Sequence, residues 1–182
     1  LAYWRLDEFE GNRLADASGH DRPGEIEGVV AFHLPGPQNK SFSGDSGNAS
    51  LQLAGGTVSA SIQDARSLSF WFWNGMSSAV RDNTGDLVSQ GNSFTLRIGG
   101  KADGEAADRL VLQVGEKEFN GTTELSLRTW RQVLLSWGDS TLNVFLDGNP
   151  EPEIQAELSG QSAGLWRLGG ELPYEGRIDE VA

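Results

Sequence analysis

The strongest constraint on the fold is an alternation of apolar and polar positions with a period of two residues. Residues 68–73 run Leu-Ser-Phe-Trp-Phe-Trp, and residues 94–98 run Phe-Thr-Leu-Arg-Ile. Successive side chains of a β-strand point to opposite faces, so this pattern predicts strands with one buried face. Further segments of the same character are Tyr3–Leu6, Ser50–Leu53, Arg109–Val114, Gln132–Trp137, Thr141–Leu146 and Gly164–Leu168.

Dipeptides that favour tight turns separate these segments: Asn74-Gly75, Asp103-Gly104, Asn120-Gly121 and Asp147-Gly148. They tolerate the positive φ angles of β-hairpins. No segment between them has the pattern of a crossover helix, which parallel strands would need, so the sheets are predicted to be antiparallel. The 182 residues are enough for one core. We therefore predict an all-β fold, an antiparallel two-sheet β-sandwich, as a single domain over residues 1–182. The stretch from Asp7 to Lys40, rich in Gly, Pro and charge, is predicted to form loops.

The charge of the chain limits its partners. A formal net charge of -12 and a sequence pI of about 4.5 repel phosphate backbones and anionic lipids, so we predict no nucleic-acid partner. No apolar run approaches the roughly eighteen residues of a spanning helix, so we predict no membrane insertion. The absence of cysteine excludes disulfides, thiolate nucleophiles and cysteine-ligated zinc. An acidic surface suits hard divalent cations such as calcium, and equally suits solubility.

A series of short motifs follows in a recognisable order along the chain. They are Tyr3–Glu8 with Gly11-Asn12 and Asp16–Gly19, Ser67–Trp73, Leu87–Gly91, Trp130–Val133, Asn143–Gly148 and Gly176–Val181. Their order resembles the laminin-G-like branch of the concanavalin A-like lectin and glucanase superfamily. The resemblance covers nearly the whole chain and implies a jelly-roll sandwich. It also implies a module of a larger exported protein, hence an extracytoplasmic location, and a chain that stops slightly before the domain's natural end.

The same resemblance bears on catalysis, because glucanases of this superfamily carry two carboxylates in a Glu-x-Asp-x-x-Glu pattern. That pattern is absent. Asp179 and Glu180 are adjacent, and adjacent strand residues point to opposite faces, so they cannot flank one glycosidic bond. Residues 8–10 have suitable alternation but adjoin a glycine-containing loop. His20 and His33 are the two histidines, and both fall in the irregular region, where histidines are usually solvated. We therefore predict that the chain is not an enzyme.

A metal site is a further hypothesis. In a jelly roll the first and last strands tend to lie together, which would bring the Asp16 loop near residues 178–181. Strict alternation along this last segment places one carboxylate on the core face, and a buried carboxylate needs a partner. A calcium ion held by Asp16, Asp179 and backbone carbonyls would supply it, since related domains often carry a structural calcium near this edge. A β-bulge, or a salt bridge from Arg177 or Arg5, is an equally good alternative.

The six tryptophans suggest carbohydrate binding, because flat aromatic faces pack on the apolar faces of sugar rings. Most aromatic residues on alternating strands nevertheless belong to the core. Trp71 is an exception, because it faces away from the core and lies outside the family pattern, whereas Trp73 coincides with the family's strand-ending tryptophan. We predict Trp71 as a ligand-binding residue, with Arg97 as a candidate polar neighbour on another outward face. Simple solvation is the alternative for Arg97.

The sequence leaves three functions open. The first is a non-catalytic extracytoplasmic recognition module that binds a glycan or a glycosylated surface, with calcium as a structural cofactor. The second is a protein-interaction or spacer domain within a multidomain exported protein. The third is a glycan-cleaving enzyme with an atypical carboxylate pair. Nothing in the sequence separates the first two, because fold resemblance alone does not specify a ligand.

Overall fold

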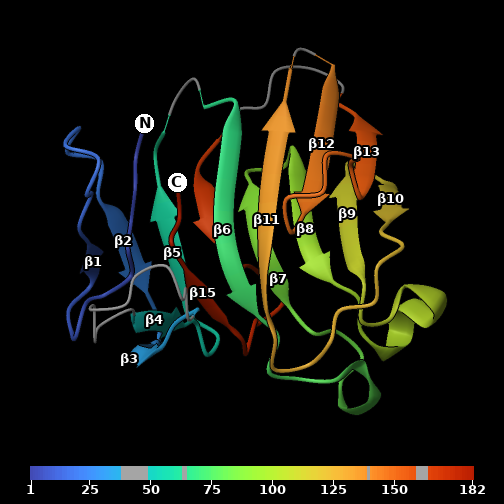
Figure 1. Cartoon of the computed structure of the whole chain (residues 1–182), viewed down its shortest axis with the longest axis horizontal. Coiled ribbons are helices and arrows are strands. Elements are labelled where there is room, and N and C mark those ends of the chain that lie inside the picture. Colours follow the sequence, from blue (N-terminus) through green and yellow to red (C-terminus); the bar gives the residue numbers. More distant parts are fainter. Residues whose placement is uncertain (38–48, 63–64, 139, 159–163) are drawn as a thin grey trace.

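The structure, a computed structural model, describes residues 1–37, 49–62, 65–138, 140–158 and 164–182. Within these residues two antiparallel sheets, one of eight strands and one of seven, stack face to face (Figure 1). The back sheet contains, in spatial order, β1 (Arg13–Leu14), β2 (Gly24–Glu27), β5 (Thr57–Ala60), β14 (Trp166–Leu168), β7 (Asp86–Gln90), β8 (Phe94–Ile98), β9 (Leu110–Val114) and β10 (Lys117–Asn120). The front sheet contains β13 (Ile154–Glu157), β12 (Thr141–Leu146), β11 (Trp130–Trp137), β6 (Ser67–Trp73), β15 (Arg177–Asp179), β4 (Ala49–Gln52) and β3 (Ala31–Pro35). The predicted fold class is confirmed.

The alternation located the long central strands well. Strands β6, β8, β9, β11 and β12 each match a predicted segment to within two residues at either end. Figure 1 shows β6 and β11 of the front sheet nearest the viewer, with β7 of the back sheet behind them. The core lies between these layers because most inward positions of the long strands are apolar.

Two predictions at the N-terminal end are wrong. Residues 3–6 form no strand, and only Trp4 makes isolated bridges. Leu6 has a φ of 63°, which ends the extended backbone. The stretch from Asp7 to residue 37 is not all loop, since it carries β1, β2 and β3; residues 38–40 lie outside the described residues. These strands are two to five residues long, too short to show clear alternation.

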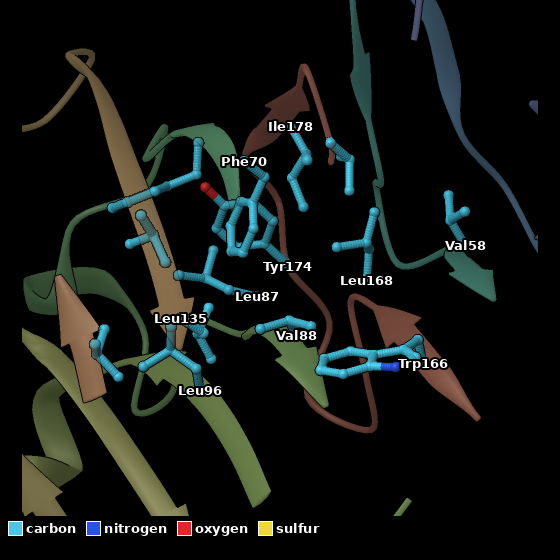
Figure 2. Close-up of a cluster of buried hydrophobic side chains, with 14 of the residues drawn as sticks. Val58, Phe70, Leu87, Val88, Leu96, Leu135, Trp166, Leu168, Tyr174 and Ile178 are labelled. Carbon is cyan, nitrogen blue, oxygen red and sulfur yellow. The ribbon is translucent and has the colours of Figure 1, made fainter. Parts of the chain in front are cut away.

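Side chains from both sheets fill the interior. Phe70 and Phe72 on β6 are fully buried. Figure 2 shows Phe70 and Ile178 of the front sheet pointing toward Leu87 and Leu168 of the back sheet. Farther along the interior, the rings of Trp137 and Trp166 lie with their centroids 5.0 Å apart. This continuous apolar layer fixes the face that each strand turns toward the solvent.

The two ends of the described chain meet beside β6 within the front sheet, and the jelly-roll prediction that they lie together is confirmed. The Trp4 backbone N–H donates to the Val181 carbonyl at 2.8 Å, and the Val181 N–H donates back to Trp4 at 2.9 Å. Trp4 also bridges to Asp16. Trp4 therefore lies between the Asp16 loop and the last segment of the chain.

Of the predicted turn dipeptides, Asp147-Gly148 forms a tight turn and Asp103-Gly104 does not form a hairpin. Asp147 and Gly148 have φ angles of 53° and 73°, and the Asn149 N–H closes a tight turn on the Leu146 carbonyl at 3.1 Å. Asp103-Gly104 instead lies within η2 (Lys101–Ala106), a 3₁₀ segment. The two-residue hairpin between β9 and β10 uses Gly115-Glu116, where a glycine at positive φ (59°) replaces the Asn-Gly signal.

Tyr174 fixes the lower end of the core between β6 and β15. Its ring is fully buried, and its hydroxyl donates to the Trp73 carbonyl at 2.9 Å. Gly176 makes this approach possible, because a Cβ at that position would lie 2.2 Å from the Tyr174 hydroxyl and 2.3 Å from the Trp73 carbonyl oxygen. The glycine of the C-terminal motif thus has a steric role.

Candidate functional site

An aromatic surface covers the outer face of the front sheet. The ladder pairs Trp130 with Trp73 and Gln132 with Trp71, and β12 places Phe145 opposite Leu134. Residues directly opposite each other in a ladder share a face. Trp71, Trp73, Trp130, Gln132 and Phe145 are all partly exposed, and we call these five residues the tryptophan patch. No labelled element crosses β6, β11 or β12 on the side that faces the viewer in Figure 1.

Trp71 lies on the side of this patch that faces β15. The ladder sets Gln132 beside it on β11 and Asp179 beside it on β15. The outward orientation follows the alternation, since Phe70 and Phe72 on either side are fully buried. Its indole ring makes no stacking or cation–π contact with another residue in the described ranges. Its ring is therefore free of an aromatic partner on a partly open face of the sheet.

The ring of the Trp73 side chain contacts other residues of the protein. The Arg177 guanidinium carbon lies 4.4 Å from the centroid of the ring, within cation–π range. The backbone at Gly75 packs against the same side chain, because a Cβ there would meet the ring at 2.6 Å. This agrees with the structural role predicted for Trp73, and it leaves Trp71 and Trp130 as the better candidates for ligand contact.

The patch extends beyond the single tryptophan that the sequence singled out. Trp130, Gln132 and Phe145 were not predicted as site residues. A signal was present: Val133, Leu135 and Trp137 of β11 are core positions, so positions 130 and 132 must face outward with Trp71. Only the pairing of β11 with β6 shows that they are neighbours.

Asp179 lies in the same ladder row as Trp71 but has no exposed surface. Its Oδ1 atom accepts a hydrogen bond from the Glu180 backbone N–H at 3.0 Å, and its Oδ2 atom is buried without a partner. Burial raises the pKa of this carboxyl to about 8, and the charges of Glu180 and Asp7 act in the same direction. Asp179 is therefore a buried acid that favours its protonated form.

A β-bulge explains why neither carboxylate of residues 178–181 takes the place of an apolar core residue. Ile178 and Val181 are both in the core although three residues apart, and Glu180 between them has a φ of 51°. The bulge adds one residue, so Asp179 pairs with Trp71 rather than replacing an apolar core residue. Of the predicted alternatives the bulge is confirmed, and no salt bridge from Asp179 to another described residue exists.

Asp16 organises the N-terminal loop. Its Oδ1 atom accepts from the backbone N–H groups of Tyr3 and Ser18, both at 2.9 Å, and its Oδ2 atom accepts from Arg22 at 2.9 Å. Burial acts to raise the pKa of Asp16, but hydrogen bonds from these three residues outweigh it and hold the pKa below its ordinary value. Both carboxylate oxygens of Asp16 are thus already used by the loop.

The two predicted calcium ligands do not combine into a donor set. Asp16 and Asp179 lie on elements that flank Trp4, but Asp16 is committed to backbone N–H groups. Among the described ranges there is no group of three or more His, Cys, Asp or Glu residues that could hold a metal ion. Calcium needs six to eight oxygen ligands, so these side chains do not fit it by themselves.

Arg97, the second predicted ligand-binding residue, lies on β8 of the back sheet, so the structure does not bring it near Trp71. Its side chain is buried, with hydrogen bonds to both Asp103 oxygens at 2.7 Å and to Glu118 at 2.9 Å. The hydrogen bond to Asp103 raises the pKa of Arg97, against the effect of burial. The side chain is therefore not simply solvated, and it fastens η2 to the sheet.

A cavity of about 430 Å³ opens between the sheets near the two ends of the described chain. Its wall includes inward-facing apolar residues such as Trp4, Val88 and Trp166, together with the polar residues Arg22, Arg66, Ser67 and Arg167. The described ranges also contain no helix long and apolar enough to cross a membrane.

The fold and its outer face define a two-sheet antiparallel β-sandwich with an aromatic surface. No family model matches the chain, and no curated protein matches it in sequence. Solved structures do resemble it. Domain 4 of AbnA, an extracellular arabinanase from Geobacillus stearothermophilus, in complex with arabinotriose, gives a TM-score of 0.64 at 16% identity, covering 99% of this chain and 89% of that domain.

Two other similar structures belong to longer chains. A mutant Trypanosoma rangeli sialidase with trans-sialidase activity gives a TM-score of 0.69 at 12% identity, and the match covers 100% of this chain but 30% of the sialidase. The binding domain of Botulinum neurotoxin DC, in complex with SialylT, gives 0.54 at 13% identity, covering 100% of this chain and 45% of that one. At these identities the likeness shows the fold alone.

Proposed function

We propose that the chain is a non-catalytic carbohydrate-binding module and that the tryptophan patch is its binding surface. The observation that carries the proposal is Trp71, a partly exposed indole without an aromatic stacking partner, beside the Gln132 amide and two residues from Trp73 on an open sheet face. Large aromatic residues gathered on an outer face are less expected than core aromatics and mark interaction sites. An aromatic ring flanked by hydrogen-bonding groups matches a sugar, which has apolar faces and a polar rim.

The similar structures support this class of ligand without establishing it. The arabinanase domain was solved with arabinotriose, and this chain covers most of that domain. The arabinanase is also described as extracellular, which supports the proposed extracytoplasmic location. The laminin-G-like kinship remains part of the proposal, on the order of the motifs that end with Gly176–Val181.

A non-catalytic role is supported by the state of the carboxylates nearest the patch. Asp179 is fully buried beside Trp71. The Asp147 carboxylate pairs with the Arg131 guanidinium at 2.9 Å. Glycoside hydrolysis needs two carboxyl groups that both reach the same bond. We expect no release of reducing sugar from polysaccharides incubated with the protein; release that is lost on Asp179→Asn or Asp147→Asn would support the enzyme alternative.

The binding test is a glycan array followed by calorimetry with the best ligand. Trp71→Ala is expected to weaken binding by about tenfold or more, as for an aromatic residue central to an interface. Phe9→Ala is the matched control, because Phe9 is 73% exposed on the N-terminal loop and outside the patch. Thermal unfolding of both variants checks that they fold. Silence of the wild type on the array, or equal effects of the two substitutions, would favour the protein-interaction alternative instead.

A further inference from the structure

The charged groups around the tryptophan patch are already neutralised or negative. The Arg131 guanidinium is paired with Asp147 at 2.9 Å. Arg177 lies over the Trp73 ring, and its Nη1 atom donates to the Pro35 carbonyl at 3.1 Å. The ladder pairs Arg131 with Phe72, a core position, so Arg131 lies on the opposite face from Trp71. Arg177, the cation that contacts the patch, is engaged within the protein. The whole molecule carries a formal net charge of -12, so its field opposes the approach of an anion.

The polar groups that are available are uncharged. Gln132 donates from Nε2 to the Ser69 hydroxyl at 3.4 Å, a long contact that a ligand hydroxyl could replace. On the next two strands Gln155 donates from Nε2 to the Asn143 Oδ1 atom at 2.8 Å. Each side-chain amide offers both a donor and an acceptor. Sugar hydroxyl groups, which also donate and accept, are suited to such partners.

These groups lie at two places on the outer face of the sheet. Ser69 and Gln132 lie beside Trp71 on β6 and β11, whereas Asn143 pairs with Gln155 and with Ser136, four residues along β11 from Gln132. Four residues of strand correspond to about 13 Å. Leu134 of β11, opposite Phe145, lies between the two places. The surface is thus longer than one sugar ring.

We infer that the tryptophan patch selects uncharged, extended glycan chains and discriminates against carboxylated or sulfated ones. The inference rests on the proposed carbohydrate-binding function and specifies its ligand class. An acidic sugar placed on Trp71 would lose hydration next to the Asp147 carboxylate and within a negative field, and Arg177, the cation that contacts the patch, is already engaged. A neutral chain meets amides, hydroxyls and aromatic faces and incurs no such cost.

The test uses pairs of oligosaccharides that differ only in a charged group, such as a neutral chain and its uronic-acid or sulfated counterpart. Calorimetry at low and high salt measures each affinity. The neutral member is expected to bind at least about tenfold more tightly at low salt, and its affinity is expected to be independent of salt. Tighter binding of the acidic member would overturn the inference and leave the proposed function standing. If the protein binds neither member of the pair and no glycan on the array, the proposed function itself is overturned.

A variant that adds a positive charge tests whether electrostatics cause the preference for neutral glycans. Gln132→Arg places an unpaired cation beside Trp71 and is expected to bring the acidic member to within about threefold of the neutral one, by raising its affinity at low salt. Gln113→Arg is the matched control, because Gln113 is an exposed glutamine on β9 of the back sheet. If both variants raise the acidic affinity equally, net charge alone is responsible. If neither raises it, the electrostatic argument is refuted.

Discussion

The buried carboxyl of Asp179 predicts a distinctive dependence of stability on pH. In the unfolded chain this group has the ordinary pKa of 3.8, whereas burial raises the folded-state pKa to about 8. Between these values the folded protein holds a proton that the unfolded chain has lost. By linkage, the stabilising contribution of protonated Asp179 is complete below about pH 4 and is lost as the pH rises to 8.

The magnitude follows from the same two values. At about 1.36 kcal/mol for each pH unit, moving a pKa from 3.8 to about 8 corresponds to about 6 kcal/mol. This is an upper limit, because water or a cation can reach the ionised group when the structure relaxes. Asp179→Asn keeps the shape of the protonated carboxyl and cannot ionise. We expect the variant to match the wild type within about 1 kcal/mol at pH 4 and to exceed its stability by at least about 2 kcal/mol at pH 9.

The assay is urea unfolding of the two proteins from pH 4 to pH 9, compared as a difference at each pH. The difference removes the contribution of every other titrating group that both proteins share. Asp21→Asn is the control for the loss of one surface carboxylate, since the side chain of Asp21 is 96% exposed. A flat difference for Asp179→Asn, a difference that falls with pH, or a rise no larger than that of Asp21→Asn would refute the reasoning.

The same pair of proteins tests the predicted calcium. A cation bound to the ionised Asp179 would raise the melting temperature of the wild type above pH 8 and would leave Asp179→Asn unchanged. Because Asp16 is committed to three backbone N–H groups, Asp16→Asn should not abolish a calcium effect that depends on Asp179. Identical wild-type melting curves in calcium and in chelator would refute the prediction that calcium binds at Asp179.

Two further substitutions test the packing of the sandwich. Gly176→Ala forces a Cβ against the Tyr174 hydroxyl, 2.2 Å away, and is expected to lower the free energy of unfolding by about 2 kcal/mol, measured by urea unfolding. Arg97→Met leaves Asp103 without its guanidinium partner and is expected to cost about 3 kcal/mol. Adding Asp103→Asn should recover part of that loss. Because pairing with Arg97 holds the pKa of Asp103 below its ordinary value, the stabilisation from this pair should fade as the pH falls toward acid.

The sequence predicted the long strands because period-two alternation is a local property. Residues 68–73 became β6 with Phe70 and Phe72 buried, as their pattern required. Residues 3–6 show the limit of this signal. Their residue types suit a strand, but Leu6 adopts a φ of 63°, a left-handed conformation that the local pattern does not predict.

The bulge at Glu180 shows the same limit within a well-predicted motif. Strict alternation along residues 178–181 predicts a carboxylate on the core face, and the added residue removes that conflict. A bulge depends on which strand is the partner, here β6 through the pairing of Asp179 with Trp71. The sequence shows that a carboxylate would fall on the core face and that a bulge, a salt bridge or a cation could accommodate it. Only the strand register shows that the bulge is present.

The candidate site was predictable in orientation but not in exposure. Trp71 and Arg97 both point away from the core on strands that alternate regularly. Arg97 is nevertheless only 7% exposed, because η2 folds over that part of the back sheet and Asp103 binds the guanidinium. Among the residues that the structure describes, no such connection covers β6 and β11 on the front sheet (Figure 1). Alternation specifies the face of a sheet on which a side chain lies, whereas the connections between strands decide which part of that face remains open to a ligand.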